Sequence, residues 1–166
     1  MTGKLHAEVT LMRIGVISDT HGKLLPEVHD AFKGVSLILH AGDFGGEEIM
    51  DELETIARVV AVRGNVDLEL APPRFPDTRR LTLEGVDIFL CHQPERAVSL
   101  FPAPRVIIHG HTHHARNEER DGVLWFNPGS AGKPKKAGDY TVGILTLQQG
   151  AVRGEIVELR QQFRDE

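Results

Sequence analysis

Five short apolar runs recur along the chain and limit its fold more than any other feature. They span residues 13–18, 35–40, 58–63, 87–92 and 105–109. Each run is rich in valine, isoleucine, leucine or phenylalanine, which favours β-strands. Because the runs are apolar at successive positions, they are typical of strands in a sheet that is covered on both faces.

Two helical patterns connect the first three runs, each with an apolar stripe on one face. The stripes are Leu25, Val28 and Phe32 in segment 24–33, and Ile49, Leu53 and Ile56 in the segment that begins at Glu47 and Glu48. Both patterns predict amphipathic helices that cover a sheet. Gly34 is placed to end the first of them. Alternation of strands and helices predicts an α/β fold.

The rest of the chain is rich in hairpin patterns. The paired segments are 78–84 with 86–92 around Gly85, 115–120 with 123–126 around Asp121-Gly122, and 140–147 with 152–159 around Gln149-Gly150. Asp-Gly is a strong signal for a two-residue turn. We expect one α/β domain over residues 13–166, with two sheets packed face to face and helices outside, preceded by an N-terminal extension at 1–12.

Composition excludes several classes of protein. The 24 acidic residues outnumber the 19 basic ones, so we expect no strong binding to nucleic acid. Cys91 is the only cysteine, so an internal disulfide cannot form and an oxidising compartment is not implied. The chain has no run of about 18 apolar residues and no export signal, so the sequence predicts a cytoplasmic protein outside the membrane.

Polar side chains that bind metals follow each apolar run. They are Asp19, His21, Asp43, Asn65, His92, His111 and His113. Loops from separate strands meet at the carboxyl edge of an α/β sheet, so these side chains are expected to share one site. Seven oxygen and nitrogen ligands exceed what one ion uses and favour a two-metal centre. Without a thiolate, the set suits manganese, iron, zinc, cobalt or nickel. Gly42, Gly64 and Gly110 fit tight turns near the ions.

These motifs together resemble those of a known family. The motifs are Asp19-x-His21, Gly42-Asp43, Gly64-Asn65, a lone His92, Gly110-His111-x-His113 and Asn127-Pro128-Gly129-Ser130. In this order and spacing they resemble the calcineurin-like metallophosphoesterases, over about residues 13–159. The resemblance is greatest to their small single-domain bacterial and archaeal phosphodiesterases, a branch that also resembles the retromer subunit with this fold.

The resemblance implies a four-layer αββα sandwich and a ligand arrangement. One ion is expected on Asp19, His21, Asp43 and His113, and the other on Asp43, Asn65, His92 and His111. Asp43 is then the bridging carboxylate, and the set of Asp43, Asn65, His92 and His111 is also expected to be catalytic. The implied cofactor is a pair of divalent ions, with manganese preferred and zinc, iron, cobalt or nickel as alternatives.

The implied reaction is hydrolysis of a small phosphoester, most simply a phosphodiester, by metal-bound water or hydroxide. A phosphomonoesterase or a cyclic-nucleotide phosphodiesterase on the same site stays open. So does a protein-binding scaffold without activity, although here all seven ligand positions are filled. A homo-oligomer is also left open.

Two departures from the family pattern concern the substrate. Many relatives have a histidine directly after the motif asparagine, where Val66 stands here, so a proton donor for the leaving group is missing at that position. Asp67 follows, and the sequence leaves open whether it contacts substrate, orients a ligand or caps the loop. Candidates for substrate contact are Asp67, His114, Ser130 and Lys133. The second departure is segment 131–136, which follows the turn at 127–130 and lies where the family varies. Its lysines are expected either to meet a substrate phosphate or to form a solvated loop.

Three further residues are interpreted structurally. His40 and His109 lie inside strands near ligands, so packing or hydrogen bonding is favoured over metal coordination. Cys91 precedes His92 on a strand, so the two side chains point to opposite faces, and Cys91 is expected to be a buried thiol.

Overall fold

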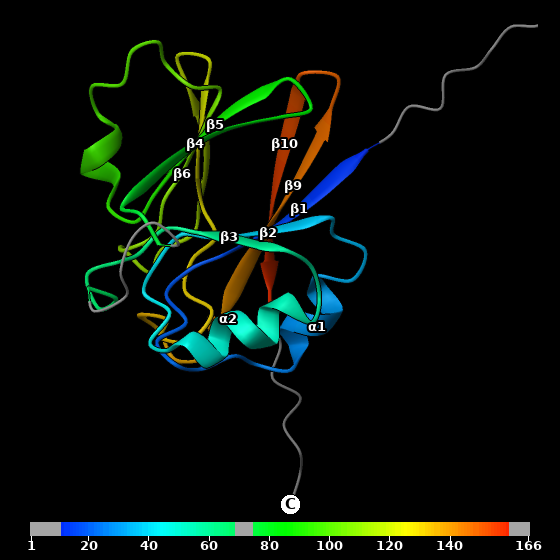
Figure 1. Cartoon of the computed structure of the whole chain (residues 1–166), viewed down its shortest axis with the longest axis vertical. Helices are drawn as coiled ribbons and strands as arrows, with labels where there is room; N and C mark the ends of the chain where they lie inside the picture. Colours follow the sequence, from blue (N-terminus) through cyan, green and yellow to red (C-terminus); the bar gives the residue numbers. More distant parts are fainter. Residues whose placement is uncertain (1–10, 69–74, 160–166) are drawn as a thin grey trace, which may run out of the picture.

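The chain forms two mixed five-stranded sheets that pack face to face (Figure 1). The computed structural model describes residues 11–68 and 75–159. Most of the expected N-terminal extension therefore lies outside the described residues, and Met12 already belongs to the first strand. Within the described ranges, none of the helices has both the length and the apolar character to cross a membrane.

The first sheet has the strand order β10-β9-β1-β2-β3. Its strands are β1 (Met12–Ile17), β2 (Leu37–His40), β3 (Val59–Ala61), β9 (Thr141–Gln148) and β10 (Ala151–Glu158). Strand β1 is parallel to β2, and β2 is parallel to β3, whereas β9 runs antiparallel to β1. The parallel part confirms the strand–helix–strand pattern that the sequence predicts.

The second sheet has the order β4-β5-β6-β8-β7. Its strands are β4 (Thr78–Leu83), β5 (Val86–Cys91), β6 (Val106–Ile108), β7 (Arg116–Arg120) and β8 (Val123–Asn127). Strands β5, β6 and β8 are parallel, and the antiparallel hairpin partners β4 and β7 lie at the edges. All three predicted hairpins are present.

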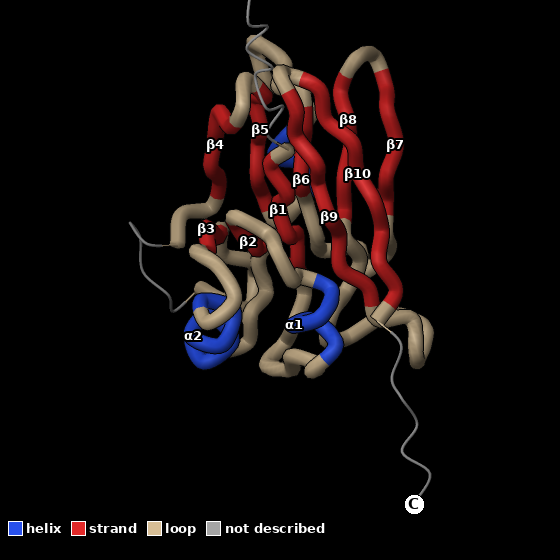
Figure 2. The backbone as a smooth tube through the Cα atoms, turned by 90° about the vertical axis from the view of Figure 1, so that its right-hand side faces the viewer, coloured by secondary structure: helices blue, strands red, loops and turns tan. Residues whose placement is uncertain are grey.

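Two helices cover the outer face of the first sheet. Helix α1 (Glu27–Ala31) and helix α2 (Glu47–Glu54) pack through Val28 and Leu53 onto a core that includes Ile17 and Ile38. Figure 2 shows both helices, in blue, below the first sheet.

Helix α1 is shorter than the predicted segment 24–33, so that prediction was wrong at both ends. Leu25 precedes Pro26, and a residue before proline avoids the helical conformation. After Ala31 the chain tightens into a turn that Gly34 ends with a φ of 82°.

The layers follow the αββα order. Between the sheets lies a fully buried core that includes Val16, Leu90 and Phe126. The outer face of the second sheet is covered by the 3-10 helix η1 (Pro94–Ala97), where Ala97 joins a small core with Cys91 (Figure 1). The fourth layer is thus a single short turn and its flanking loops. Cys91 is buried as predicted, and burial raises the pKa of its thiol to about 12.

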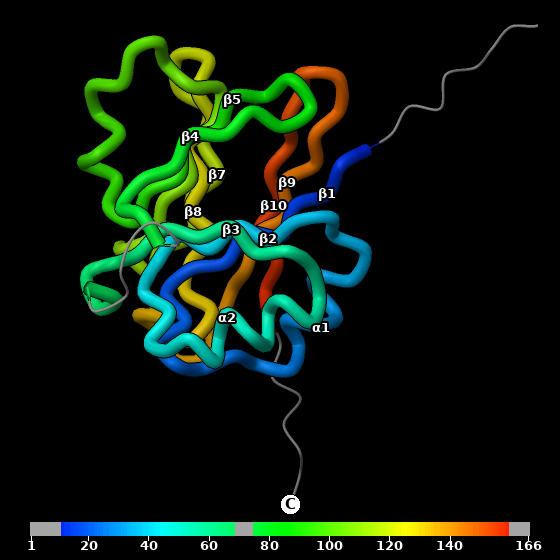
Figure 3. The backbone as a smooth tube through the Cα atoms, viewed as in Figure 1, coloured from blue at the N-terminus to red at the C-terminus, as the bar shows by residue number. Residues whose placement is uncertain are grey.

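The two ends of the sheets differ in their connections. The three hairpin turns lie together at one end, at the top of Figure 3. The backbone N–H of Gly150 donates to the carbonyl of Glu84 there, so two of the turns touch. The carboxyl ends of the parallel strands lie at the other end and carry the loops of the candidate site.

Candidate metal centre

Hydrogen bonds between backbone groups tie the strand-end loops to one another. The N–H of Asp19 donates to the carbonyl of Gly42 at 3.0 Å, which joins the loops after β1 and β2. The N–H of Gly110 donates to the carbonyl of His92 at 3.0 Å, which joins those after β5 and β6. Residues far apart in the sequence therefore meet at one edge of the sandwich.

A first group of ligand atoms surrounds Asp19, which is fully buried. Its Oδ1 atom lies 3.1 Å from Nε2 of His113 and 3.7 Å from Nε2 of His21. These three side chains could hold one ion. They match three of the four ligands expected for the first metal.

A second group surrounds Asp43. Its Oδ2 atom lies 3.2 Å from Nε2 of His92 and 3.6 Å from Nε2 of His21, so it faces histidines of both groups. Nδ1 of His111 lies 3.3 Å from Nε2 of His92. The carboxylate of Asp19 reaches His92 as well, at 3.9 Å. Both carboxylates therefore lie between the two groups, and Asp19, Asp43 and His92 could together hold an ion.

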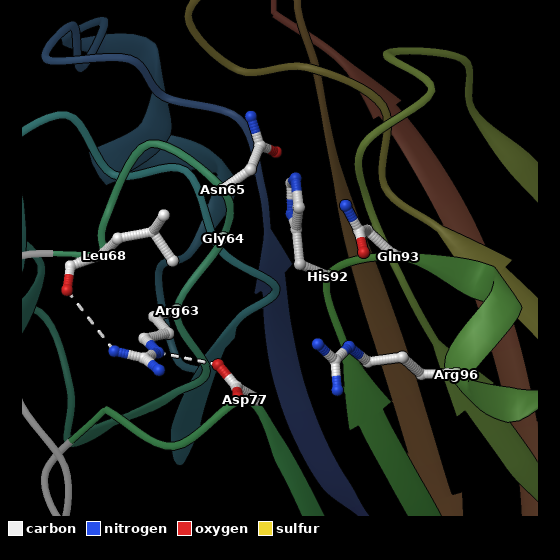
Figure 4. A pocket seen from close by; sticks show the side chains of 8 residues that line it. All are labelled: Arg63, Gly64, Asn65, Leu68, Asp77, His92, Gln93 and Arg96. Atoms are coloured by element: carbon white, nitrogen blue, oxygen red, sulfur yellow. Dashed lines mark hydrogen bonds and ion pairs between the residues drawn. The ribbon is translucent and has the colours of Figure 1, made fainter.

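Asn65 stands beside this second group. Figure 4 shows its side chain next to the ring of His92, and both residues line the same pocket. Asn65 is exposed, as is His111, so this side of the site is open to solvent.

Unpaired buried atoms and the spacing of the ligand atoms indicate that the site fits a cation. Oδ1 of Asp19 and Nε2 of His21 are buried atoms without a hydrogen-bond partner. An unpaired buried carboxylate oxygen is costly, and such groups are usually paired or bound to a metal. Ligand atoms about 2.1 Å from a shared ion lie roughly 3 to 4 Å apart. The distances of 3.1 to 3.7 Å from Asp19 to His21 and His113 and from Asp43 to His21 and His92 fit that spacing.

Backbone carbonyls orient two of the histidines. Nδ1–H of His92 donates to the carbonyl of Ala41 at 2.8 Å, and Nδ1–H of His113 donates to that of Lys133 at 2.5 Å. In the neutral imidazole such a bond leaves Nε2 without a proton and points it at the site, as in protein metal centres.

The site holds its carboxylates in the charged form. Burial raises the pKa of Asp19, but the imidazoles of His21, His92 and His113 outweigh it and hold that pKa below its usual value. Burial lowers the pKa of His92, but the facing Asp43 and Asp19 raise it above its usual value. A bound cation would take the place of the proton on such a histidine.

The backbone is left-handed at five of the seven expected ligands. The φ angles are 55° at Asp19, 47° at His21, 60° at Asp43, 71° at His111 and 59° at His113. Residues other than glycine rarely adopt this conformation, which clusters at functional sites.

Close backbone approach explains the neighbouring glycines. A Cβ atom on Gly64 would lie 2.0 Å from Oδ1 of Asp43, and one on Gly110 would lie 2.6 Å from Oδ2 of Asp19. The interpretation of these glycines as tight-turn residues near the ligands agrees with this geometry.

Asp67 holds two of the site loops together. Its buried carboxylate accepts the backbone N–H groups of Asp43 at 2.7 Å, Phe44 at 3.0 Å, Gly45 at 3.4 Å and Gly64 at 2.9 Å. Of the roles that the sequence left open for Asp67, the loop cap fits this geometry. With its oxygens used by the backbone, the side chain faces the protein rather than a substrate.

The two other histidines near the site are structural. His40 is fully buried, accepts the N–H of Gly42 on Nδ1 at 3.0 Å, and places Nε2 3.2 Å from Oγ1 of Thr20. Burial lowers its pKa to about 3. His109 is buried, with Nδ1 3.1 Å from the carbonyl of Gly110. Both agree with the predicted packing and hydrogen-bonding roles.

The other candidates for substrate contact lie in different surroundings. Ser130 is buried, and its hydroxyl donates to the carbonyl of Asp19 at 2.8 Å and accepts the N–H of Lys133 at 2.8 Å. The side chains of Lys133 and His114 are exposed at the rim. Asn127 donates to the carbonyl of Gly110 at 3.2 Å, so the turn that it begins supports a site loop.

Two further features lie beside the expected ligands, and the sequence does not point to them directly. The orienting carbonyls of Ala41 and Lys133 carry no side-chain signal. The pocket beside Asn65 and His92 is also lined by Arg63 and Arg96, which were not singled out. A proline directly before a short charged segment, at Pro94, was the available signal for the helix that carries Arg96.

Comparison with known proteins finds relatives in both sequence and structure. The calcineurin-like phosphoesterase superfamily domain matches residues 12–150. The probable metallophosphoesterase of Methanothermobacter thermautotrophicus is 37% identical over 160 residues, which cover 88% of this chain and 92% of the relative. A phosphodiesterase of Methanocaldococcus jannaschii is 29% identical over 168 residues, covering 89% of this chain and 100% of that protein. The structure of vacuolar protein sorting 29 from Cryptosporidium parvum has a TM-score of 0.70 at 19% identity, covering 91% of this chain and 99% of that one, and shows a shared fold.

Proposed function

The chain belongs to the calcineurin-like phosphoesterase superfamily, and we propose from this premise that it hydrolyses phosphodiesters with two divalent metal ions. The relatives include proteins named as a metallophosphoesterase and as a phosphodiesterase. The observation that carries the proposal is the pair of buried atoms without partners, Oδ1 of Asp19 and Nε2 of His21, inside a cluster of carboxylates and histidines.

We assign the ligands in two sets that share Asp43. One set is Asp19, His21, Asp43 and His113, and the other is Asp43, Asn65, His92 and His111. The position of Oδ2 of Asp43 between His21 and His92 supports the sharing. The mixture of oxygen and nitrogen ligands without a thiolate favours manganese, with zinc, iron, cobalt and nickel as alternatives.

The side chains of the site have distinct roles in the proposed hydrolysis. Two bound cations would supply a lowered pKa for water and a countercharge for the phosphoryl oxygens. Asp19 and Asp43 stay charged and hold the cations, and the N–H of Val66 fixes Oδ1 of Asp43 at 3.1 Å. The exposed side of the site at Asn65 and His111 admits the phosphate ester.

The site lacks a proton donor for the leaving group at position 66. Val66 is 50% exposed and carries no proton donor where many relatives have a histidine. General acid catalysis contributes roughly 10²- to 10⁴-fold, so diesters with a nitrophenol leaving group should react at least about 100-fold faster than alkyl diesters. Similar rates for aryl and alkyl leaving groups would contradict this.

Metal analysis combined with turnover of bis(p-nitrophenyl) phosphate tests the proposal. The wild type should bind two ions per chain and turn the diester over. Asp43→Asn should lose both ions and reduce kcat/KM on the order of 10³-fold. Asp51→Asn, on the exposed side of α2, is the matched control and should change neither.

Retained activity in Asp43→Asn would refute the ligand assignment. A wild type that turns over no phosphoester with manganese, zinc, iron, cobalt or nickel would favour the scaffold alternative, which the fold shared with vacuolar protein sorting 29 keeps open. Faster turnover of p-nitrophenyl phosphate or of a cyclic nucleotide would move the assignment to those substrates.

A further inference from the structure

A small pocket adjoins the metal centre and differs from it in chemistry. His92 and Asn65 form the wall that it shares with the centre, and Arg63, Asp77, Gln93 and Arg96 line the remainder (Figure 4). Its volume is about 130 Å³. Because a cavity needs only about 10 to 15 Å³ of this kind of volume to hold one water molecule, the space is large enough for a group the size of a phosphate or carboxylate.

One of the two arginines is held by the protein itself. Nε of Arg63 donates to Oδ1 of Asp77 at 2.6 Å, and Nη1 donates to the carbonyl of Leu68 at 3.4 Å. The charges of Arg63 and Asp77 therefore offset each other. This pair forms one wall of the pocket in a defined geometry.

Arg96 brings a charge that the pocket does not offset. It lies on η1, whose Ala97 is anchored against Cys91, and its guanidinium points into the pocket opposite Arg63 (Figure 4). It makes no hydrogen bond or close ion pair with any residue in 11–68 or 75–159. The three charged groups Arg63, Arg96 and Asp77 then sum to one positive charge. A guanidinium suits two-point hydrogen bonding to a carboxylate or phosphate.

Two exposed apolar side chains lie near the pocket. Leu68 is 65% exposed and lines the pocket, and Val66 is 50% exposed. Exposed apolar groups beside a polar site favour contact with the carbon skeleton of a ligand.

We propose that this pocket binds a second anionic group of the substrate, so that the chain prefers phosphodiesters whose retained portion carries a carboxylate or phosphate, with Arg96 as the residue that determines this specificity. The inference rests on the proposed function for the position of the scissile phosphate at the metals. Gln93, half-buried in the same wall, offers an amide to the same group.

Binding of phosphinates, which have P–C bonds in place of both ester bonds and are therefore not hydrolysed, tests this without requiring turnover. The probes are diphenylphosphinate and its 3-carboxyphenyl and 3-phosphonophenyl analogues, titrated calorimetrically into manganese-loaded protein. The wild type should bind an anionic analogue about fivefold more tightly than the phenyl compound, as for an exposed charge pair. The two analogues show which anion the pocket prefers.

Arg96→Gln should abolish the preference and leave the affinity for the phenyl compound unchanged within about twofold. Arg105→Gln is the matched control, since Arg105 pairs with Glu119 at 3.3 Å outside the pocket, and it should keep the preference. Equal affinities in the wild type, or equal weakening of all probes in Arg96→Gln, would overturn the proposal. If the preference depends on Arg96 but bis(p-nitrophenyl) phosphate is not hydrolysed, the anion pocket stands and the proposed function fails.

Discussion

The hairpin end and the metal end of the sandwich both use left-handed backbone, but for different reasons. At the hairpin end it occurs in three two-residue turns, Glu84-Gly85, Asp121-Gly122 and Gln149-Gly150. Such turns require a positive φ at both central residues, and glycine supplies the second. The conformation there is a local property of the turn.

At the metal end the left-handed residues are the expected ligands, and distant groups hold them in place. The N–H of Asp43 is bound by Asp67, and the N–H of His111 donates to Oδ2 of Asp19 at 3.1 Å, 92 positions away. Strain of this kind persists only where the surrounding structure holds it. The same backbone conformation therefore has a local origin at the hairpin end and a tertiary origin at the metal end.

A methyl group added to a glycine at each end should produce the largest difference in stability between the two ends. In Gly64→Ala, Cβ would lie 2.5 Å from the backbone nitrogen of Asp43, so we expect a loss of about 3 kcal/mol of unfolding free energy together with the metals. In Gly122→Ala, nothing lies within 4 Å, and only the φ of 78° costs about 1 kcal/mol. Urea unfolding measures both. Equal losses of unfolding free energy would show that the two ends do not differ in this way.

An aspartate-to-asparagine pair tests the distant hydrogen bonds. Asp67→Asn replaces one acceptor oxygen by an amide that faces backbone N–H groups, so stability should fall by about 2 to 3 kcal/mol, and metal affinity with it. Asp121→Asn should stay within about 0.5 kcal/mol of the wild type, because both residues suit the turn before Gly122. Thermal unfolding and metal titration check the pair. An Asp67→Asn protein with full metal affinity would rule out the loop-holding role.

A buried histidine gives the metal end a pH dependence. The pKa of His40 is lowered by burial to about 3, so the unfolded chain takes up its proton near pH 6.5 while the folded chain does not. Stability should therefore fall as the pH decreases from 6.5 towards 3, by about 2 kcal/mol at pH 5.

In metal-free protein, unfolding at pH 7 and pH 5 should show a smaller loss for His40→Asn than for the wild type, because burial also lowers the pKa of His109 and that histidine remains in the variant. His29→Gln, which removes an exposed histidine paired with Glu52, should behave as the wild type. The same pH dependence in all three proteins would place its origin elsewhere.

The smallest changes in stability are expected for substitutions of the left-handed residues themselves. Gln149→Asn creates the preferred Asn-Gly turn and should raise stability by about 0.5 kcal/mol without changing metal content. His111→Asn keeps a residue type that tolerates this conformation, so the metal-free protein should change by less than about 0.5 kcal/mol. It should nevertheless bind metal more weakly. Unchanged metal affinity would remove His111 from the ligand set.

Much of the fold could be predicted from sequence because its signals are local. The apolar runs at β1, β2 and β5 and the turns at Asp121-Gly122 and Gln149-Gly150 depend on neighbouring residues alone. Helix α1 shows the limit of this approach, since its apolar stripe extended past the residues that Pro26 and Gly34 allow to be helical.

For the site, the residue types and their order were sufficient to predict that Asp19, His21, Asp43, His92 and His113 gather at one edge. The chemistry of a carboxylate or imidazole belongs to the residue itself, and the strand order of an α/β sheet brings strand ends together. Both properties are therefore readable from the chain before it folds.

How those groups are held, and which groups lie beside them, depends on contacts that form in the folded chain. The carbonyls of Ala41 and Lys133 that orient His92 and His113 are chemically the same as every other carbonyl in the chain, so no residue type marks them. Arg96 likewise lies beside the site because η1 and the loop after β3 line the same pocket. Such contacts join residues with no local relation, and they exist only once the chain has folded.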